Sequence, residues 1–423
     1  MAPWLETLRT GDWLTRERMR LWAAAVLAAS GAGLLFLIVT SNGLIDYQGR
    51  PLGSDFSNVY AAGTYVLDGK AAAPFDWPAQ FSREKAIFGE TTQFYGWHYP
   101  PFFLFIAGAL ATMPYQLALA VWQGVTLVLY LLCVREIVRF SFPNPTPGEG
   151  KDFANDPLVY LLALAFPAVL VNMGHGHNGF LTAALMGYAL VVLDRRPVLA
   201  GILFGLLSYK PQFGLLIPLV LIASGRWRTL AAAAATVALL ILATTLVFGS
   251  DVWRAFFASM HLTRVEVLEA GGTGWHKIQS LFAWARMWGG SVPLAYAAQG
   301  AVTLAIGGVL VWLWRSEAAY PVKATALAIG AILATPYSLD YDMMVLAPAI
   351  AYLAADGMTR GFGPWEKSTL ALLWFVPLFA RAIAEHTLIP LGVLAMLAVF
   401  VLALRRALSD TAVFTRGAPV PSS

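Results

Sequence analysis

Polar residues that could do chemistry stand between long apolar stretches of this sequence, and the first is a carboxylate. Asp55 lies in "GSDFSNVYAAGTYVLDGK" (residues 53–70), shortly after an apolar run long enough to cross a bilayer. The spacing of Phe56 and Tyr65 favours a short amphipathic helix on the membrane surface, with Ser54 or Asp55 near its N-cap. A carboxylate in this setting suits a general base, and capping of the helix is an equal alternative.

A second group of candidates follows in the aromatic stretch "FYGWHYPP" (residues 94–101). Its rings are typical of an interfacial belt that anchors a loop. His98 and Tyr99 could also hydrogen-bond a ligand, and sugar faces stack on aromatic rings. We therefore include His98 and Tyr99 among the substrate-binding candidates.

The stretch "NMGHGHNGF" (residues 172–180) places glycines, histidines and asparagines between two apolar segments. A tight turn here would present His175, His177 and Asn178 to a polar ligand. The two histidines could hold a metal, but no third ligand is near in sequence, so a metal site is not favoured. A structural turn remains an alternative.

Lys210 in "LLSYKPQFG" is a charge inside an apolar region, where charges are costly and usually functional. Pro211 breaks the helix beside it, so the ammonium group is expected to face a cavity rather than lipid. A phosphate is a natural partner for such a lysine. Snorkelling of the side chain to the outer interface is the alternative.

Two later stretches add charged candidates. The loop "RVEVLEAGGTGWHKIQSLFAWAR" has glycines that let the backbone approach a ligand, and cations that could meet phosphate. A loop without a role is equally consistent. In "ATPYSLDYDMM", two aspartates could pair with Lys210 or Arg381, could act in catalysis, or could hold a divalent cation, for which the signal is weak. The candidates from these stretches are Arg264, Lys277, Gln279, Asp340 and Asp342.

Composition sets the class of the protein. The 423 residues are 58% hydrophobic and only 12% charged, with a mean hydropathy of +0.65. So few charges cannot cover a soluble protein of this length, and continuous apolar segments exclude a β-barrel. The net charge of +4 is spread in short basic clusters, which predict topology rather than nucleic-acid binding. The single Cys133 excludes an internal disulfide, and nucleotide-binding motifs such as a P-loop are absent from the sequence.

The expected fold is therefore an all-α polytopic membrane protein. Counting inside-facing arginines and an inside N-terminus gives about 12 crossings, with the short segment 101–113 re-entrant. We expect one integral membrane domain over 1–404, with extracytoplasmic loops at 42–100 (catalytic, bearing short surface helices) and 250–291, and a cytoplasmic tail at 405–423. Apolar segments lie at 21–41, 101–113, 117–134, 158–173, 179–193, 198–209, 211–224, 229–249, 292–314, 320–335, 340–355, 368–384 and 387–404.

Four stretches together resemble glycosyltransferase family 87 of the GT-C superfamily, over roughly residues 50–350. They are "SDFSNVYAAGTYVLDGK", "WHYPPFFLFIAGALATMP", the segment from "GHGHNGF" through "YKPQFG" to "SGRWR", and "TPYSLDYDMMVLAPAI". The resemblance implies a GT-C type fold and Asp55 as the base, and Lys210 matches the family's lysine. His177 stands where relatives often carry glutamine.

The same resemblance, which extends to the phosphatidylinositol mannoside mannosyltransferases, implies an activity. It implies inverting transfer of a hexose, typically mannose, from a polyprenyl-phosphate donor to a lipid or glycan acceptor. The site would face the exterior of a bacterial plasma (inner) membrane, with membrane lipids as surroundings. The lipid-linked sugar is a substrate, so no cofactor and no metal are expected.

The residues alone are also consistent with two other functions. A lipid-carrier flippase or transporter would spread polar residues along a path through the membrane. A membrane acyltransferase or polymer ligase would use a histidine base, with His175, His177 or His276 in place of Asp55.

Overall fold

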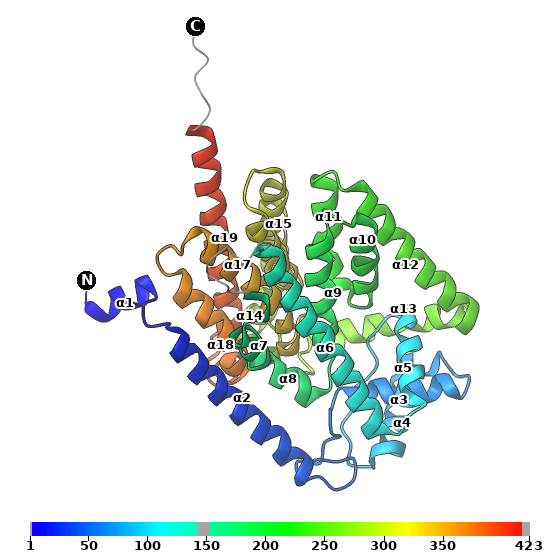
Figure 1. The fold of residues 1–423 in the computed structure, drawn as a ribbon. Coiled ribbons are helices and arrows are strands. Elements are labelled where there is room, and N and C mark those ends of the chain that lie inside the picture. The colour runs from blue at the N-terminus through cyan, green and yellow to red at the C-terminus, as the bar shows by residue number, and fades with distance from the viewer. Residues whose placement is uncertain (1, 143–152, 417–423) are drawn as a thin grey trace.

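The fold is built of helices throughout the part of the chain that the structure describes. The computed structural model describes residues 2–142 and 153–416, which contain helices and isolated β-bridges but no strand (Figure 1). An all-α fold was expected from the continuous apolar segments. Residues 417–423, the end of the expected tail, lie outside the described residues, whereas its first part continues the last helix to Arg416.

Six helices are long and apolar enough to cross a membrane. A bilayer core of about 30 Å needs about 20 helical residues, and each of these helices meets that length. They are α2 (Arg16–Val39), α6 (Tyr115–Ser141), α12 (Trp227–Phe248), α15 (Val292–Arg315), α18 (Glu366–Thr387) and α19 (Leu391–Arg416).

The remaining apolar segments form shorter helices, so the expected count of about 12 crossings is wrong. The structure supports six spans by length and composition, or seven if one bent helix pair counts as a span. A helix of 11–15 residues reaches only about 16–23 Å, which is too short to cross the bilayer core alone. The shorter apolar helices are α5 (Leu104–Ala111) with the preceding turn Pro101–Phe103, α9 (Gly179–Val192), α10 (Pro197–Leu206) with Leu207–Tyr209, α11 (Leu216–Ala223) with Pro211–Gly214, α16 (Tyr320–Leu333) and α17 (Leu346–Arg360).

The bent pair replaces the single span expected at 158–173. Helices α7 (Pro157–Leu164) and α8 (Pro167–His175) meet at 49°. Phe166 is extended, with ψ 120°, because a residue before proline is disfavoured in the helical region. The bend aims the end of α8 at the loop that carries Asp55.

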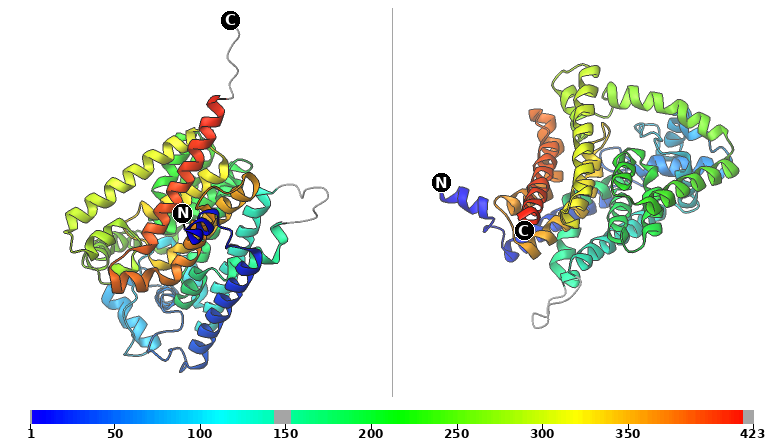
Figure 2. Two further views of the ribbon diagram at one scale, coloured as in Figure 1. Left: turned by 90° about the vertical axis from the view of Figure 1, so that its left-hand side faces the viewer. Right: turned by 90° about the horizontal axis from the view of Figure 1, so that it is seen from above.

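Small residues let the central helices pack closely. Nearly all of α16 from Val322 to Leu333 is buried, and it contacts α15, α17 and α19. Helix α2 is different, because Ala23 is its only buried residue, and it follows one edge of the bundle toward the loop 42–100 (Figure 1, Figure 2).

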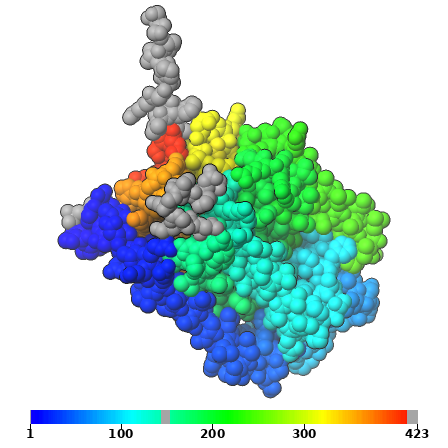
Figure 3. Space-filling view, viewed as in Figure 1, coloured from blue at the N-terminus to red at the C-terminus, as the bar shows by residue number. Residues whose placement is uncertain are grey.

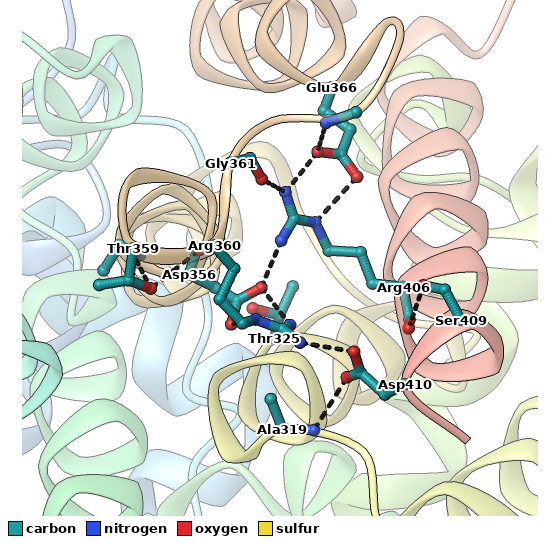
Figure 4. Close-up of polar contacts among 12 residues, drawn as sticks. Ala319, Thr325, Asp356, Thr359, Arg360, Gly361, Glu366, Arg406, Ser409 and Asp410 are labelled. Carbon is teal, nitrogen blue, oxygen red and sulfur yellow. Dashed lines mark hydrogen bonds and ion pairs between the residues drawn. The ribbon is translucent and has the colours of Figure 1, made fainter. Parts of the chain in front are cut away.

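A buried ionic cluster ties α19 to α17 and α18 at the end of the bundle away from that loop. The Arg406 guanidinium donates to Asp356 at 2.5 Å and to Glu366 at 2.8 Å (Figure 4). Arg360 bridges Asp356 to Asp410 on α19. Every charge drawn in this cluster has an opposite partner, as burial requires.

The two polar loops carry short helices and contact each other. The first holds α3 (Phe56–Leu67) and α4 (Trp77–Phe88), and the second holds α13 (Asp251–Leu262), the π-helix Thr263–Glu269 and α14 (Leu281–Met287). Phe75 and Phe256 join them with ring centroids 5.8 Å apart. On the molecular surface the blue-to-cyan part of the chain adjoins the green part (Figure 3).

Helix α3 does not lie free on a surface as expected. Eight of its 12 residues are buried, because α5 packs against it. Gly63 permits this approach, since an added Cβ would lie 2.1 Å from the carbonyl oxygen of Ala107. The helix therefore holds Asp55, at its start, in a fixed position. The remaining described helix, α1 (Pro3–Thr10), lies at the N-terminus.

Candidate functional site

One large cavity of about 1310 Å³ brings together segments that are far apart in the chain. The loop 42–100, the end of α8, the break around Lys210, the loop 250–291 and the segment 335–342 all contribute to its wall. Ten of the candidate residues line it: Asp55, His98, Tyr99, His175, His177, Lys210, Arg264, Lys277, Asp340 and Asp342.

Asp55 occupies the N-cap position of α3 without capping it. Its backbone is helical, with φ −78° and ψ −22°, and its side chain accepts no hydrogen bond from the first turn. The backbone N–H of Asp55 donates to the carbonyl of His175 at 2.9 Å, and its carboxylate lies 3.7 Å from His175 Nδ1. Ser54 Oγ is 3.0 Å from the same nitrogen. The geometry therefore leaves the carboxylate available to the cavity.

The turn after α8 presents His177 to a ring of aromatic side chains. His177 Nε2 and the Tyr99 hydroxyl are 3.0 Å apart, and Tyr341 stacks on the imidazole with centroids 3.5 Å apart. The turn is supported from behind, because Asn172 accepts from the N–H of Gly179 at 2.7 Å. Gly176 adopts the left-handed conformation, φ 63°, that closes α8.

Lys210 forms a buried ion pair with Asp342, which was one of the pairings expected from the sequence. Both side chains are less than 5% exposed, so Lys210 does not snorkel to water. The Asp342 carboxylate also accepts from the N–H of Leu339 at 3.0 Å. Its neighbour Asp340 lies 3.9 Å from Arg381, which is the other expected pairing.

The second polar loop adds cations to the cavity wall. Lys277 is half-buried, and burial together with the charge of Arg381 lowers its pKa. Arg264 lies 3.4 Å from Glu269 and remains more than half exposed. His98 Nδ1 is 3.0 Å from Thr263 Oγ1, and burial lowers the pKa of His98 to about 4, so this histidine is neutral. It can hydrogen-bond a ligand but brings no charge.

Two candidate residues lie outside the cavity wall. Asn178 is buried beneath the turn, where its carbonyl accepts from the hydroxyls of Thr182 and Tyr209. The backbone N–H of Gln279 donates to Ser338 at 2.7 Å, and its side chain donates to the Lys277 carbonyl at 3.4 Å. Both residues therefore support the site from behind.

Sequence reasoning missed several residues of the wall. Arg50 and Tyr209 line the cavity, as does Tyr341, which the repeated tyrosines of "YSLDYD" could have indicated. Glu84, which does not line the cavity, was also missed: it is fully buried and accepts from the N–H groups of Tyr95 and Gly96, which do line it, at 3.0 and 3.2 Å. Burial raises the pKa of Glu84 to about 7.

Part of the cavity wall is apolar and is called the apolar branch here. It is formed by side chains of α10, α11 and α12. The apolar lining consists of Phe204, Leu215, Ile217, Pro218, Leu221, Leu230, Ala233, Ala234, Val237, Ala238 and Ile241. Such a wall suits a hydrocarbon chain, whereas the charged end suits an anion.

A second cavity of about 440 Å³ meets the first. It lies between α2, α8 and α18, and its apolar lining includes Leu34, Leu170 and Leu378. Both cavities are lined by Arg50, Ser54, His175, Asp340 and Arg381. The residues around Asp55 are therefore reached from two sides. In the described part of the chain, no three His, Cys, Asp or Glu side chains are grouped to hold a metal ion.

Comparison with known proteins assigns the chain to a family. No curated protein and no solved structure matches it. The model of glycosyltransferase family 87 matches residues 97–336, which is more than half of the chain and includes His98, His177 and Lys210. Asp55 precedes the matched region, so its role is argued from geometry. The chain belongs to glycosyltransferase family 87.

Proposed function

We propose that this membrane glycosyltransferase transfers a hexose, mannose in the first instance, from a polyprenyl-phosphate donor to a lipid or glycan acceptor. The reaction would take place on the extracytoplasmic face of a bacterial plasma membrane, with inversion at the anomeric carbon. The observation that carries this proposal is that Asp55 and Lys210, far apart in sequence, line one cavity with both charged and apolar walls.

The two parts of the cavity match the two parts of a lipid-linked sugar. The donor phosphate would lie among Lys210, Lys277 and Arg264, whose charges favour an anion. Its polyprenyl chain would follow the apolar branch between α10, α11 and α12. The hexose would then lie near Tyr99 and His177, since aromatic faces and hydroxyl groups suit a sugar.

The proposed step is a direct displacement. Asp55 accepts the proton of an acceptor hydroxyl as that oxygen attacks the anomeric carbon and the bond to the phosphate oxygen breaks. The electron pair of that bond leaves with the polyprenyl phosphate, which the cations stabilise. His175, 3.7 Å from the carboxylate, would hold Asp55 in position. The products are a glycosylated acceptor of inverted configuration and the free lipid phosphate.

The acceptor would approach through the second cavity. Its walls on α2, α8 and α18 are apolar over much of their length, and it reaches Ser54 and His175, the immediate neighbours of Asp55. Entry from this side would keep the acceptor apart from the polyprenyl chain of the donor. A lipid-anchored acceptor could thus reach the base without leaving the membrane.

The alternatives find less support. Membership of a glycosyltransferase family argues against a flippase. A histidine base is disfavoured because His177 is bound to Tyr99 and stacked on Tyr341, and His276 does not line the cavity. His175 remains the histidine nearest the proposed chemistry, in a positioning role.

The proposal is tested with purified protein and a choice of donors. We expect radiolabelled mannose to move from polyprenyl-phosphate mannose to extracted membrane lipids or glycans, and not from a nucleotide-linked mannose. The configuration of the product bond, read by NMR, should be opposite to that of the donor. Transfer from the nucleotide sugar alone, or retention of configuration, would contradict the proposal.

A further inference from the structure

A third cavity, separate from the candidate site, lies between α2 and the rest of the bundle. It measures about 460 Å³, within the ~300–1,000 Å³ range of ligand pockets. Its wall is made of α2, α6, α7, α17 and α18 and is almost wholly aliphatic or aromatic, with Met19, Val134, Ile350, Leu370 and Trp374 among its side chains. None of its lining residues belongs to the first two cavities.

This cavity is positioned to meet lipid. Its walls α2, α6 and α18 are long enough to cross a membrane. Helix α2 buries only Ala23 and leaves much of its apolar surface exposed, including Leu21, Trp22 and Leu35. An apolar space between such helices takes up hydrocarbon more readily than water, because transfer of apolar groups out of water is favourable.

The mouth of the cavity carries a defined set of charges. Arg16 and Asp156 form an ion pair at 2.5 Å, so their charges offset each other. Lys367, which also lines the cavity, has no carboxylate within 4.0 Å in the described part of the chain. Its ammonium lies 5.6 Å from the ring centroid of Phe362. The ammonium group of Lys367 is therefore a positive charge at the mouth that no carboxylate of the described chain balances.

Hydrogen bonds between the N-terminal segment and the start of α18 hold this mouth in shape. Trp13 Nε1 donates to Ser368 Oγ at 2.8 Å, and Ser368 Oγ donates to the carbonyl of Leu8 at 2.6 Å. Gly11 packs on the stem of Lys367, since an added Cβ would lie 2.5 Å from Lys367 Cβ. The stem of Lys367 is therefore packed beside the opening.

We propose that this cavity binds one phospholipid with an anionic headgroup. An acyl chain lies between α2 and the bundle, and the headgroup phosphate lies beside Lys367. The lipid joins α2 to α6, α17 and α18, across a gap where protein contacts are few. The proposal is independent of the transferase reaction, because the cavity shares no residue with the candidate site.

The test uses phosphatidylglycerol carrying a photoreactive diazirine in its acyl chain, added to the full-length protein in detergent micelles. We expect labelled peptides from α2 and α17. Ala351→Phe fills the cavity and should lower that labelling about tenfold. Ala354→Leu is a milder filling variant if Ala351→Phe does not fold, and gel filtration with a melting curve checks both. Labelling that is unchanged in a folded filling variant overturns the proposal.

A charge variant tests the headgroup. Competition with unlabelled phosphatidylglycerol should exceed competition with phosphatidylcholine in the wild-type protein. Lys367→Gln should reduce this preference about fivefold, as expected for one lysine at a membrane surface. Arg315→Gln, an exposed arginine that does not line the cavity, is the matched control and should leave the preference unchanged. Equal competition by the two lipids in the wild type also overturns the proposal.

Discussion

The ion pair between Lys210 and Asp342 has a structural role and a proposed functional role, and variants can test the two separately. Both side chains are less than 5% exposed, and Asp342 also accepts from the N–H of Leu339. Asp342→Asn keeps that acceptor but leaves the buried ammonium without its counter-charge. Removing one partner of a buried ion pair costs about 3–5 kcal/mol, so this variant should melt well below the wild type.

The double variant Lys210→Met, Asp342→Asn removes both charges at once. An uncharged pair of similar size is close to neutral in stability, so most of the lost melting temperature should return. Transfer activity should not return, because the proposed donor phosphate would have lost its buried cation. Lys210→Met alone should be both less stable and inactive.

The assay combines melting of the detergent-solubilised protein with initial rates of transfer from polyprenyl-phosphate mannose. Gel filtration establishes that each variant is monodisperse before rates are compared. A double variant with near-normal stability and near-normal transfer would refute the role of Lys210 at the phosphate. An Asp342→Asn protein as stable as the wild type would refute the geometry of the pair.

Two further predictions concern groups outside the cavity. Arg406→Met leaves the carboxylates of Asp356 and Glu366 buried without their shared cation. The free energy of unfolding, followed by thermal melting, should therefore fall by about 3–5 kcal/mol. The kcat of the protein that remains folded should be unchanged. Burial raises the pKa of Glu84 from 4.5 in the unfolded chain to about 7. Between these two pH values the folded protein therefore binds one more proton than the unfolded chain. The free energy of unfolding should fall as pH rises through this window, by up to about 3 kcal/mol. Glu84→Gln should flatten that part of the curve of melting temperature against pH, and an unchanged slope would contradict the assignment.

The sequence identified the apolar segments well but not the number of crossings. Each expected segment contains helix, since residue hydrophobicity is a local property. The length of a helix decides whether it can cross the membrane. Breaks at Phe166 and Lys210 shorten the helices, and hydropathy averaged over neighbouring residues does not show such breaks. Proline at position 167 was the available signal for the first break, whereas the break beside Lys210 was already expected from Pro211.

The charged residues of the candidate site could be predicted from the sequence, but the contacts between its side chains could not. Intramembrane charges are costly, which made Lys210 and its pairing with Asp342 predictable from residue type alone. Tyr341 was missed because stacking on His177 depends on how the segment 335–342 returns to the turn after α8. Asn178 and Gln279 do not line the cavity, and the sequence of a turn does not determine which of its side chains reach a ligand.

The central claim is that Asp55 accepts the proton of the acceptor hydroxyl, and one rate comparison tests it most directly. Asp55→Asn keeps the size of the side chain and removes the base, so single-turnover transfer should fall about 10²–10⁴-fold with donor binding retained. Asp76→Asn, in the same loop, is the control, because asparagine caps α4 as well as aspartate does and its rate should match the wild type. A folded Asp55→Asn enzyme that transfers at the rate of the Asp76→Asn control would contradict the account.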